Sequence, residues 1–441
     1  RYVGTSANPT DPEGWYLISA PVDGQNINTF KNEVLRSGEK YAIAPYDNSF
    51  ATNRYNYFTD NEGENDISLA GVFTRGKGYS IKRESTGTFD FSGLLNTSDV
   101  SVAITDNSSA VGNQWNLIGN PFTAAINLNN FADATNNFLL ANVSKLNPSR
   151  VAIYQWNSIT ASYDIINQAT GNANYIAPGQ GFFVESKVGG ETIIFSEAMQ
   201  THQTGAIFSK STNTVSEINL IVKDENTSNK TQIKYMEGTT TGLDVGYDAG
   251  TFSGVSNAFS IFTHLVSESE GVDFDLQCLP NQDFDSMIIP IGVKADSNKN
   301  ITISAEILNL PDGIEIYLED KETNTFTNLS TGNYSFKTSS ALNGIGRLYL
   351  HTSSKALSVD DNFGLKNISI YKSSKTNLRI VGIKNGNVKI KLFDVLGKQV
   401  LITNFVGKGL NDVKLPNLKT GVYLVRLQSE KGNQTKKIII E

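Results

Sequence analysis

The chain is poor in the residues that cross-link proteins or commonly catalyse reactions. Its 441 residues include one cysteine, Cys278, so no disulfide can form within the chain. The fold must therefore be stabilised by burial and strand pairing alone. Cys278 lies in an apolar run with Leu276 and Leu279, which predicts a small core residue rather than a reactive thiol.

Histidine is also scarce, with only His202, His264 and His351. No two of them have metal-ligand spacing, and the HExxH and GxSxG motifs are absent. A Ser-His-Asp triad can be scattered along a chain, and a glycosidase needs only two carboxylates, so neither is excluded. We expect histidines at the surface or at strand ends. We also expect a protein that is not an enzyme and has neither a metal site nor a cofactor.

Long apolar runs are missing as well. No stretch approaches the ~18–20 apolar residues that a membrane-spanning helix needs. Helical periodicity is rare, and residues 128–142 are the best helix candidate.

Glycine, asparagine, serine and threonine are abundant and separate short apolar runs, a pattern typical of β-sandwiches. A chain of this length should contain more than one domain. We predict an all-β protein with tandem β-rich repeat units, a β-sandwich of jelly-roll or immunoglobulin-like type, and a small C-terminal immunoglobulin-like β-sandwich. The predicted boundaries are 1–105 and 106–205 for the repeat units, 206–370 for the sandwich and 371–441 for the C-terminal module.

The first two hundred residues contain one unit twice. Residues 14–21 (GWYLISAP) match residues 114–121 (QWNLIGNP), and residues 76–81 (GKGYSI) match residues 178–184 (PGQGFFV). We interpret the Gly-x-Gly segments as tight turns that lead into strands. Neither segment has the pattern of a P-loop or a dinucleotide-binding loop.

Aromatic residues recur at equivalent places of the two units. This recurrence favours core packing. Because aromatic faces bind the faces of sugar rings, the alternative is a glycan groove lined by Trp15, Trp115 and Trp156, together with Tyr46 and Tyr154.

The pattern of residues 206–370 predicts one sandwich of short strands with polar turns. The predicted strands are residues 217–222, 232–236, 259–263, 287–293, 300–307, 315–320, 332–336 and 346–351. Several carboxylates could supply oxygen ligands to Ca²⁺, which prefers six to eight of them. These carboxylates are Asp244, Asp248, Asp273, Asp275, Asp283 and Asp285. No EF-hand pattern is present, and we expect them at turns and on solvent-facing surfaces.

The C-terminal module differs from the body in charge. Of the 37 basic and 44 acidic residues, 12 and 4 lie in residues 376–441, which leaves 25 and 40 elsewhere. The acidic body argues against nucleic-acid binding there. In the module, lysines alternate with apolar residues along predicted strands. Lysines on the solvent-facing side of a sheet explain this pattern, and the alternative is that they bind a charged partner.

Three segments of the module carry a family resemblance: residues 388–400 (VKIKLFDVLGKQV), 418–427 (LKTGVYLVRL) and 436–441 (KKIIIE). In this order, at the C-terminus, they resemble the type A C-terminal sorting domain of the type IX secretion system of Bacteroidetes. The resemblance implies two partners, the translocon and its outer-membrane shuttle protein. The sorting-signal residues that it implies are Leu396, Gly397, Lys398, Gly421, Tyr423, Leu424, Val425, Lys436, Lys437 and Ile438. The preceding sandwich resembles the jelly-roll-like domain often found before sorting domains.

These features predict an exported, non-enzymatic protein of the cell surface or the medium: an adhesin, a stalk or a binding module. Its expected ligand is a surface glycan or another surface protein. The alternatives are a carbohydrate-binding protein, or an accessory part of a secreted hydrolase whose catalytic domain lies upstream of Arg1. The chain begins without methionine or the apolar core of a signal peptide, so we expect an export signal to precede Arg1.

Overall fold

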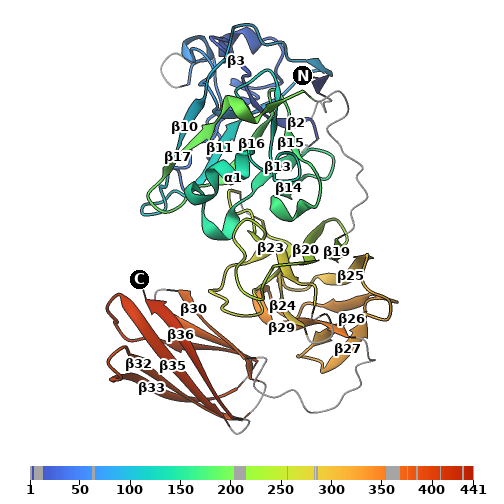
Figure 1. Ribbon diagram of the computed structural model, residues 1–441, viewed down its shortest axis with the longest axis vertical. Coiled ribbons are helices and arrows are strands. Elements are labelled where there is room, and N and C mark those ends of the chain that lie inside the picture. The colour runs from blue at the N-terminus through green and yellow to red at the C-terminus, as the bar shows by residue number, and fades with distance from the viewer. Residues whose placement is uncertain are drawn as a thin grey trace. The chain divides into compact units, whose positions relative to one another are not determined.

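In a computed structural model of the chain, almost all regular structure is β-strand, which confirms the predicted fold class (Figure 1). The described residues are 2–3, 13–61, 65–202, 215–255, 257–282, 284, 287–353, 368–374, 376–383, 386–407, 409–429 and 432–440. The chain forms two compact units, and each is described by itself. Unit 1 comprises Arg1–Thr214 and Val245–Ser256, and unit 2 comprises Val215–Asp244 and Asn257–Glu441.

The repeat in the sequence is also a repeat in the fold of unit 1. Its strands are β2 (Trp15–Ser19), β6 (Ile43–Pro45) and β7 (Gly78–Lys82) in the first repeat, and β11 (Trp115–Gly119), β13 (Ile153–Asn157) and β16 (Gly181–Glu185) in the second. β7 pairs with β2 and β6, as β16 pairs with β11 and β13. Ser19 lies opposite Gly78, just as Gly119 lies opposite Gly181. The two repeats therefore share one antiparallel arrangement in one register.

The Gly-x-Gly turns join the two repeats reciprocally. Ser19 N donates to Gly179 O (3.2 Å), and Gly119 N donates to Gly76 O (2.9 Å). Gly76 and Gly179 have φ values of 70° and 71°, which glycine adopts without strain and which fit the predicted turns. A β-carbon on Gly181 would lie 2.9 Å from a backbone nitrogen of the first repeat. Each turn thus needs its first glycine for φ and its second for a close approach of the other repeat.

The remaining strands of unit 1 are short. They are β1 (Tyr2–Val3), β3 (Val22–Asp23), β4 (Arg36–Ser37), β5 (Lys40–Tyr41), β8 (Gly87–Thr88), β9 (Leu94–Leu95), β10 (Val100–Ile104), β12 (Ala125–Asn127), β14 (Ser162–Ile166), β15 (Tyr175–Ile176), β17 (Glu191–Phe195), β18 (Gln200–Thr201) and β21 (Ala249–Gly250). Single 3-10 turns occupy Ile27–Phe30, Ile67–Leu69, Val143–Lys145, Pro148–Arg150, Gln168–Thr170 and Glu197–Met199.

The helix predicted at residues 128–142 is present only at its end, as α1 (Phe138–Asn142). Polar side chains hold the preceding backbone in turns. Asp133 Oδ1 accepts hydrogen bonds from Thr135 N and Asn136 N, both at 2.8 Å. Asn137 caps the helix by accepting from Leu140 N (2.9 Å). Short polar side chains compete with helical hydrogen bonds in this way, so the apolar spacing alone overestimated the helix.

Unit 2 contains the predicted sandwich, built from one continuous sheet. Its strands are β19 (Ser216–Lys223), β20 (Ser228–Met236), β22 (Ser260–Thr263), β23 (Phe274–Pro280), β24 (Ile288–Ala295), β25 (Asn300–Leu308), β26 (Glu315–Asp320), β27 (Thr325–Asn328), β28 (Tyr334–Lys337) and β29 (Leu342–Ser353). The sheet order is β27-β26-β29-β24-β22-β23-β20-β19-β25-β28. Leu220 of β19, Ile291 of β24 and Leu318 of β26 share one core, so strands distant in the sheet order pack face to face.

Each of the eight strands predicted for the sandwich is present, whereas β23 and β27 were missed. β23 was missed although Phe274, Leu276 and Cys278 alternate with Asp275 and Gln277, and in the fold it is buried on both faces. Cys278 lies in β23 and is fully buried, which confirms it as a core residue.

The C-terminal module, also in unit 2, is a small sandwich of two sheets (Figure 1). One sheet has the order β30-β31-β34 and the other β33-β32-β35-β36. Their bounds are β30 (Ser369–Ser374), β31 (Asn377–Ile383), β32 (Asn387–Asp394), β33 (Gln399–Val406), β34 (Gly409–Lys414), β35 (Gly421–Ser429) and β36 (Gly432–Ile440). Val388, Ile390 and Leu392 of β32 face Leu378 and Ile380 of β31 across one apolar core.

Candidate functional site

The predicted signal residues Leu396, Gly397 and Lys398 form the turn between β32 and β33. Asp394 Oδ1 accepts from Leu396 N (3.0 Å) and Lys398 N (2.9 Å), and Gly397 has φ 81°. Asp394 and Gly397 therefore account for the shape of the turn. They do not explain why the turn also contains two apolar residues, Val395 and Leu396, whose side chains are 71% and 91% exposed. Two adjacent exposed apolar side chains mark this turn as a candidate contact.

The signal residues on β35 and β36 divide between the core and the surface. Tyr423, Val425 and Ile438 are buried in the core, and Tyr423 Oη also donates to Lys419 O (2.8 Å). Gly421 begins β35. Leu424 and Lys437 point outward, because successive side chains of a strand alternate between faces. Lys436 lies half-buried on the inward face. A motif read from sequence as one signal thus contains both fold-forming and surface residues.

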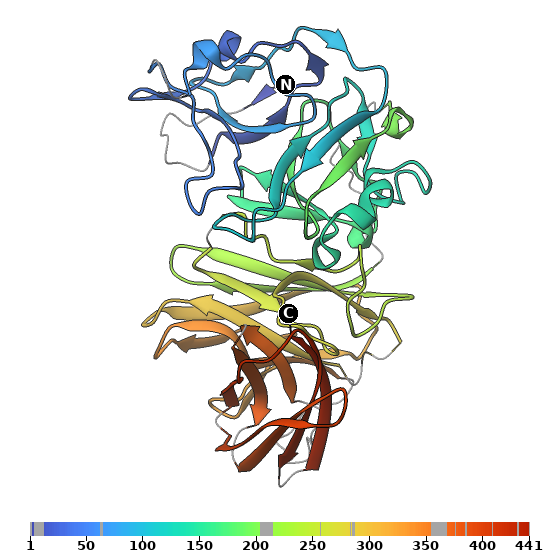
Figure 2. The ribbon, with the colours of Figure 1, turned by 90° about the vertical axis from the view of Figure 1, so that its left-hand side faces the viewer.

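The outward face of the sheet β33-β32-β35-β36 can be mapped from its register. Figure 1 labels these four strands, and Figure 2 shows the same red module turned by 90°. Across the middle of the sheet, Lys391 lies opposite both Ile402 and Arg426, and Lys389 lies opposite Asn404. At the end nearest the β32–β33 turn, Phe393 lies opposite Leu424, Leu424 opposite Lys437, and Val422 opposite Ile439.

This outer face divides into two regions. The basic band consists of Lys389, Lys391, Arg426 and Lys437. The apolar end consists of Phe393, Val422, Leu424 and Ile439, with Val395 and Leu396 in the adjoining turn.

The three tryptophans have different environments. Trp115 is fully buried, and its Nε1 donates to Ser253 Oγ (3.0 Å), so it packs in the core as the favoured interpretation expects and has no face open to the alternative, a glycan. Trp15 is half-buried at the edge of Tyr57, with ring centroids 5.9 Å apart. Trp156 is half-buried against Tyr163, at 5.1 Å. Trp115 packs as a core residue because Phe252 and Ser253 of the segment Val245–Ser256 cover it.

The segment Val245–Ser256, which follows the first two sandwich strands in sequence, is part of unit 1 and contacts the second repeat. The ring centroid of Phe252 lies 4.5 Å from Trp115, 4.1 Å from Tyr163 and 5.1 Å from Phe183. Polar contacts extend along the segment: Tyr154 Oη donates to Gly250 O (2.6 Å) and Asn167 Nδ2 to Tyr247 O (2.7 Å). Two of these partners, Trp115 and Tyr154, had been candidates for a glycan groove.

Two histidines are buried in unit 2. His351 lies within β29 and contacts Glu319 Oε2 (3.0 Å). His264 directly follows β22, and its Nε2 contacts Asp273 Oδ1 (2.8 Å) while its Nδ1 lies 3.5 Å from Ser269 Oγ. His264 lies at a strand end, as predicted, whereas His351 lies within a strand. Both side chains are buried, contrary to the predicted surface positions.

The Ser269–His264–Asp273 chain resembles a nucleophile, base and orienting acid in composition. Its Ser–His distance of 3.5 Å exceeds the ~2.6–3.2 Å of an activating hydrogen bond. Ser269 Oγ also accepts from Gly271 N (3.4 Å), and the ring of Tyr371 lies 5.5 Å from the imidazole. This geometry fits a network that fixes the loop after β22 better than an activated serine.

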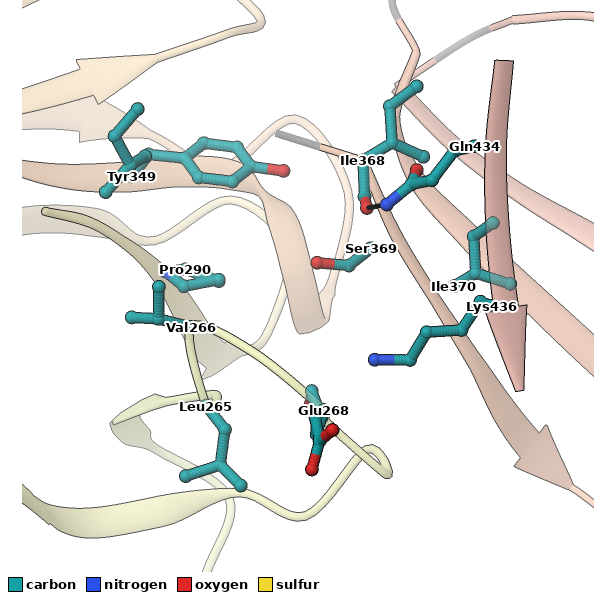
Figure 3. Close-up of a pocket in the computed structure, with 12 residues that line it drawn as sticks. Leu265, Val266, Glu268, Pro290, Tyr349, Ile368, Ser369, Ile370, Gln434 and Lys436 are labelled. Carbon is teal, nitrogen blue, oxygen red and sulfur yellow. Dashed lines mark hydrogen bonds between the residues drawn. The ribbon is translucent and has the colours of Figure 1, made fainter. Parts of the chain in front are cut away.

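A cavity of about 330 Å³ lies beside this loop in unit 2 (Figure 3). Leu265, Val266 and Pro290 of the sandwich form one wall, and Ile370 and Lys436 of the C-terminal module form part of the other.

The polar groups of the cavity are only partly paired. Gln434 Nε2 donates to Ile368 O (3.1 Å), whereas no described protein group bonds Tyr349 Oη or Gln434 Oε1. Burial lowers the pKa of Lys436, and Glu268 and Glu270 oppose this shift. The cavity could therefore accept a small polar group, though its hydrogen-bonding atoms specify no particular ligand.

The proposed Ca²⁺ ligands are dispersed. Asp244 accepts from Thr240 N (2.7 Å), as an aspartate at a turn does, and Asp273 contacts His264. Asp283 and Asp285 lie outside the described residues. Within the described ranges, no group of three or more His, Cys, Asp or Glu side chains could hold a metal ion.

A family model described as a domain of unknown function (DUF8693) matches residues 5–350, more than half of the chain. The chain belongs to this family. A second model, described as a secretion system C-terminal sorting domain, matches residues 372–441. This match confirms the predicted type IX sorting domain, so this DUF8693 protein is exported to the cell surface or secreted. In the part of the chain that the structure describes, no helix is long and apolar enough to cross a membrane.

A comparison with curated proteins gives no match. Among solved structures, dimeric latent PorU from Porphyromonas gingivalis is 12% identical, with a TM-score of 0.17 over 57% of this chain and 31% of that one. The FN1–FN3 domains of chicken CNTN1 are 11% identical, with a TM-score of 0.14 over 51% and 91%. The BSP domain of a biofilm associated protein is 8% identical, with a TM-score of 0.21 over 100% and 98%. Such low TM-scores support no argument about fold or function, and the DUF8693 chain spans only 31% of the PorU chain.

Sequence reasoning missed two features of the site. The insertion of Val245–Ser256 into unit 1 left no local signal, since its few apolar residues are scattered among glycines and serines without a strand or helix period. The division of the outer face into a basic band and an apolar end was present in the strand alternation, but it needed the pairing register to become visible.

Proposed function

We propose that this DUF8693 protein is a non-enzymatic adhesin or stalk, delivered through the type IX pathway and acting at the cell surface. Its sorting domain establishes the export route. The finer steps, recognition by the translocon and transfer to an outer-membrane shuttle protein, are part of the proposal. The alternative interpretation, that the chain is an accessory part of a larger hydrolase, stays a prediction.

The observation that supports this proposal is the path of the chain between the two units. Val245–Ser256 belongs to unit 1, although the residues on both sides of it belong to unit 2. The chain therefore passes from one unit to the other three times instead of once. Pulling the units apart would require extraction of this segment, not only extension of a linker.

The contacts of the segment would resist such extraction. Phe252 is 7% exposed and packs among aromatic rings of the second repeat. Gly254 O accepts from Tyr46 Oη (3.1 Å), and Gly246 O accepts from Gln168 N (3.0 Å). Adhesins and stalks transmit force along the chain, and a doubly tethered segment suits that task.

A second candidate function is carbohydrate binding, supported by one aromatic pair. Trp156 of β13 lies directly opposite Tyr163 of β14, and both side chains are half-buried. Aromatic rings with one accessible face can stack on sugar rings. A glycan array probed with the whole chain tests this candidate. Binding that Trp156→Ala removes and Trp15→Ala retains would support it, and an array without binding would reject it.

The main proposal is tested with beads coated with the purified whole chain. We expect retention under flow on extracellular polysaccharide, on matrix proteins or on cells of the producing bacterium, above that of uncoated beads. The same preparation should not hydrolyse fluorogenic ester, peptide or glycoside substrates. Lack of retention on every surface would reject adhesion. Turnover that disappears in His264→Ala would reject the non-enzymatic assignment while leaving the export route intact.

A further inference from the structure

Among the described residues of the sorting domain, the basic band has no acidic side chain beside it on its own face. Lys391 lies directly opposite Arg426, and like charges in this position destabilise a sheet. The outward positions of β32, β33, β35 and β36 carry no aspartate or glutamate. Among the described residues, no carboxylate lies within 4.0 Å of a nitrogen of the four basic side chains. The described residues of the sorting domain therefore leave this repulsion uncompensated.

The apolar end adjoins the basic band on the same face. Val422, Leu424 and Ile439 are 37%, 43% and 46% exposed, and they lie in neighbouring positions across β35 and β36. Leu424 lies opposite Lys437, so the two regions are continuous. Isolated exposed apolar residues are common, whereas a contiguous patch with a charged border is typical of an interaction surface.

A sheet edge borders the same face. β36 is the last strand in the order β33-β32-β35-β36, and β35 is the only described strand that pairs with it. Such an edge can add a partner strand through main-chain hydrogen bonds. Charge, apolar surface and a free edge thus meet at Lys437 and Ile439.

We propose that this outer face docks onto a protein of the secretion machinery whose contact surface combines carboxylates with an apolar centre. The proposal rests on the sorting role of the domain and adds which face is recognised and by what chemistry. Carboxylates would relieve the repulsion between Lys391 and Arg426, and an apolar centre would cover Leu424. Complementary charge would also speed the encounter and reject basic partners.

The first test is a charge reversal that does not impair folding. Lys391→Glu places an acid opposite Arg426 and should stabilise the sheet while removing the cation that docks. In the producing bacterium, we expect export of the whole chain to fall by about tenfold, with the protein retained in the periplasm. The matched control is Lys414→Glu, which makes the same charge change at an exposed position of the opposite sheet and should leave export unchanged.

The second test identifies what contacts the face. A photo-crosslinking amino acid at Leu424 should form a product with a component of the secretion machinery, whereas one at Leu410 on the opposite sheet should not. Reversing an acidic residue of that component to lysine should restore export of Lys391→Glu. This reciprocal rescue separates docking from a general effect of charge.

Three outcomes would overturn the proposal. One is normal export of Lys391→Glu. Another is binding of the whole chain to vesicles containing phosphatidylglycerol or lipopolysaccharide that Lys391→Glu removes, without a protein crosslink at Leu424, since this would make the face a membrane contact. The last is self-association in sedimentation that depends on Lys391, since the acidic body of a second copy would then be the occupant.

Discussion

Phe252 gives the sharpest test of the inserted segment. Its ring is 7% exposed and contacts Trp115, Tyr154, Tyr163 and Phe183, with centroid distances of 4.1–5.7 Å. Phe252→Ala removes these contacts and leaves a cavity within an aromatic cluster that cannot easily collapse. Buried Phe→Ala substitutions cost about 3–5 kcal/mol, and we expect the free energy of unfolding of unit 1 to fall by about that amount.

The assay uses the distribution of tryptophan. The chain has three tryptophans, Trp15, Trp115 and Trp156, and all three lie in unit 1. Tryptophan fluorescence during urea or thermal unfolding therefore reports on unit 1 and not on unit 2. For a unit of this size, each kcal/mol shifts the midpoint by about 2–4 °C, so a fall of roughly 10 °C is expected.

Phe50→Ala serves as the matched control, because Phe50 lies in the same unit and is 50% exposed. Its effect should stay within about 0.5 kcal/mol, as for surface substitutions in general. A loss below about 1 kcal/mol for Phe252→Ala would refute the reasoning, since it would mean that the segment adds little to the stability of unit 1. The mechanical argument for a stalk would lose its main support.

The other predictions concern the contact between the repeats, the reactivity of Ser269 and the dependence of stability on pH. Gly181→Ala should destabilise unit 1 by about 1–3 kcal/mol, measured by tryptophan fluorescence, because the methyl group meets the first repeat's backbone. A fluorophosphonate probe should leave Ser269 unlabelled in intact-mass analysis, and stoichiometric labelling would indicate an activated serine. Burial opposes ionisation of Asp320, but hydrogen bonds from Arg347 and Tyr334 outweigh it and lower its pKa. Asp320 therefore stabilises unit 2 above its unfolded-state pKa of about 4 and loses this effect as pH falls, so Asp320→Asn should weaken acid sensitivity in near-ultraviolet circular dichroism. An unchanged acid transition would contradict this.

Local patterns were sufficient for most strands of unit 2. Alternation located the strands of the sorting domain, and short runs between polar turns located the eight predicted strands of the sandwich. The repeat was readable because matching residues occupy matching registers, with Ser19 opposite Gly78 and Gly119 opposite Gly181. β23 was missed although its apolar and polar residues alternate. The helix before Asn142 was overestimated because capping side chains are weak signals in an apolar pattern.

The candidate sites were harder to predict because they depend on packing across distant parts of the sequence. The sequence favoured a core position for Trp115 but left a glycan groove open as the alternative, since the residue that encloses it, Phe252, is 137 positions away. It likewise offered His264 and Asp273 as unrelated residues and gave no sign of Ser269, and only the loop after β22 brings the three together.

By itself, the sequence determined the all-β class, the internal repeat and the sorting domain that directs this protein out of the cell. These features depend on periodicity, turn chemistry and contiguous motifs, which act over a few residues. The tertiary structure alone decided that the repeats join reciprocally through their glycines, that Val245–Ser256 is part of unit 1, and that the sorting domain presents a basic band beside an apolar end. Each of these depends on strand register or on contacts between remote residues, and only folding brings those residues into contact.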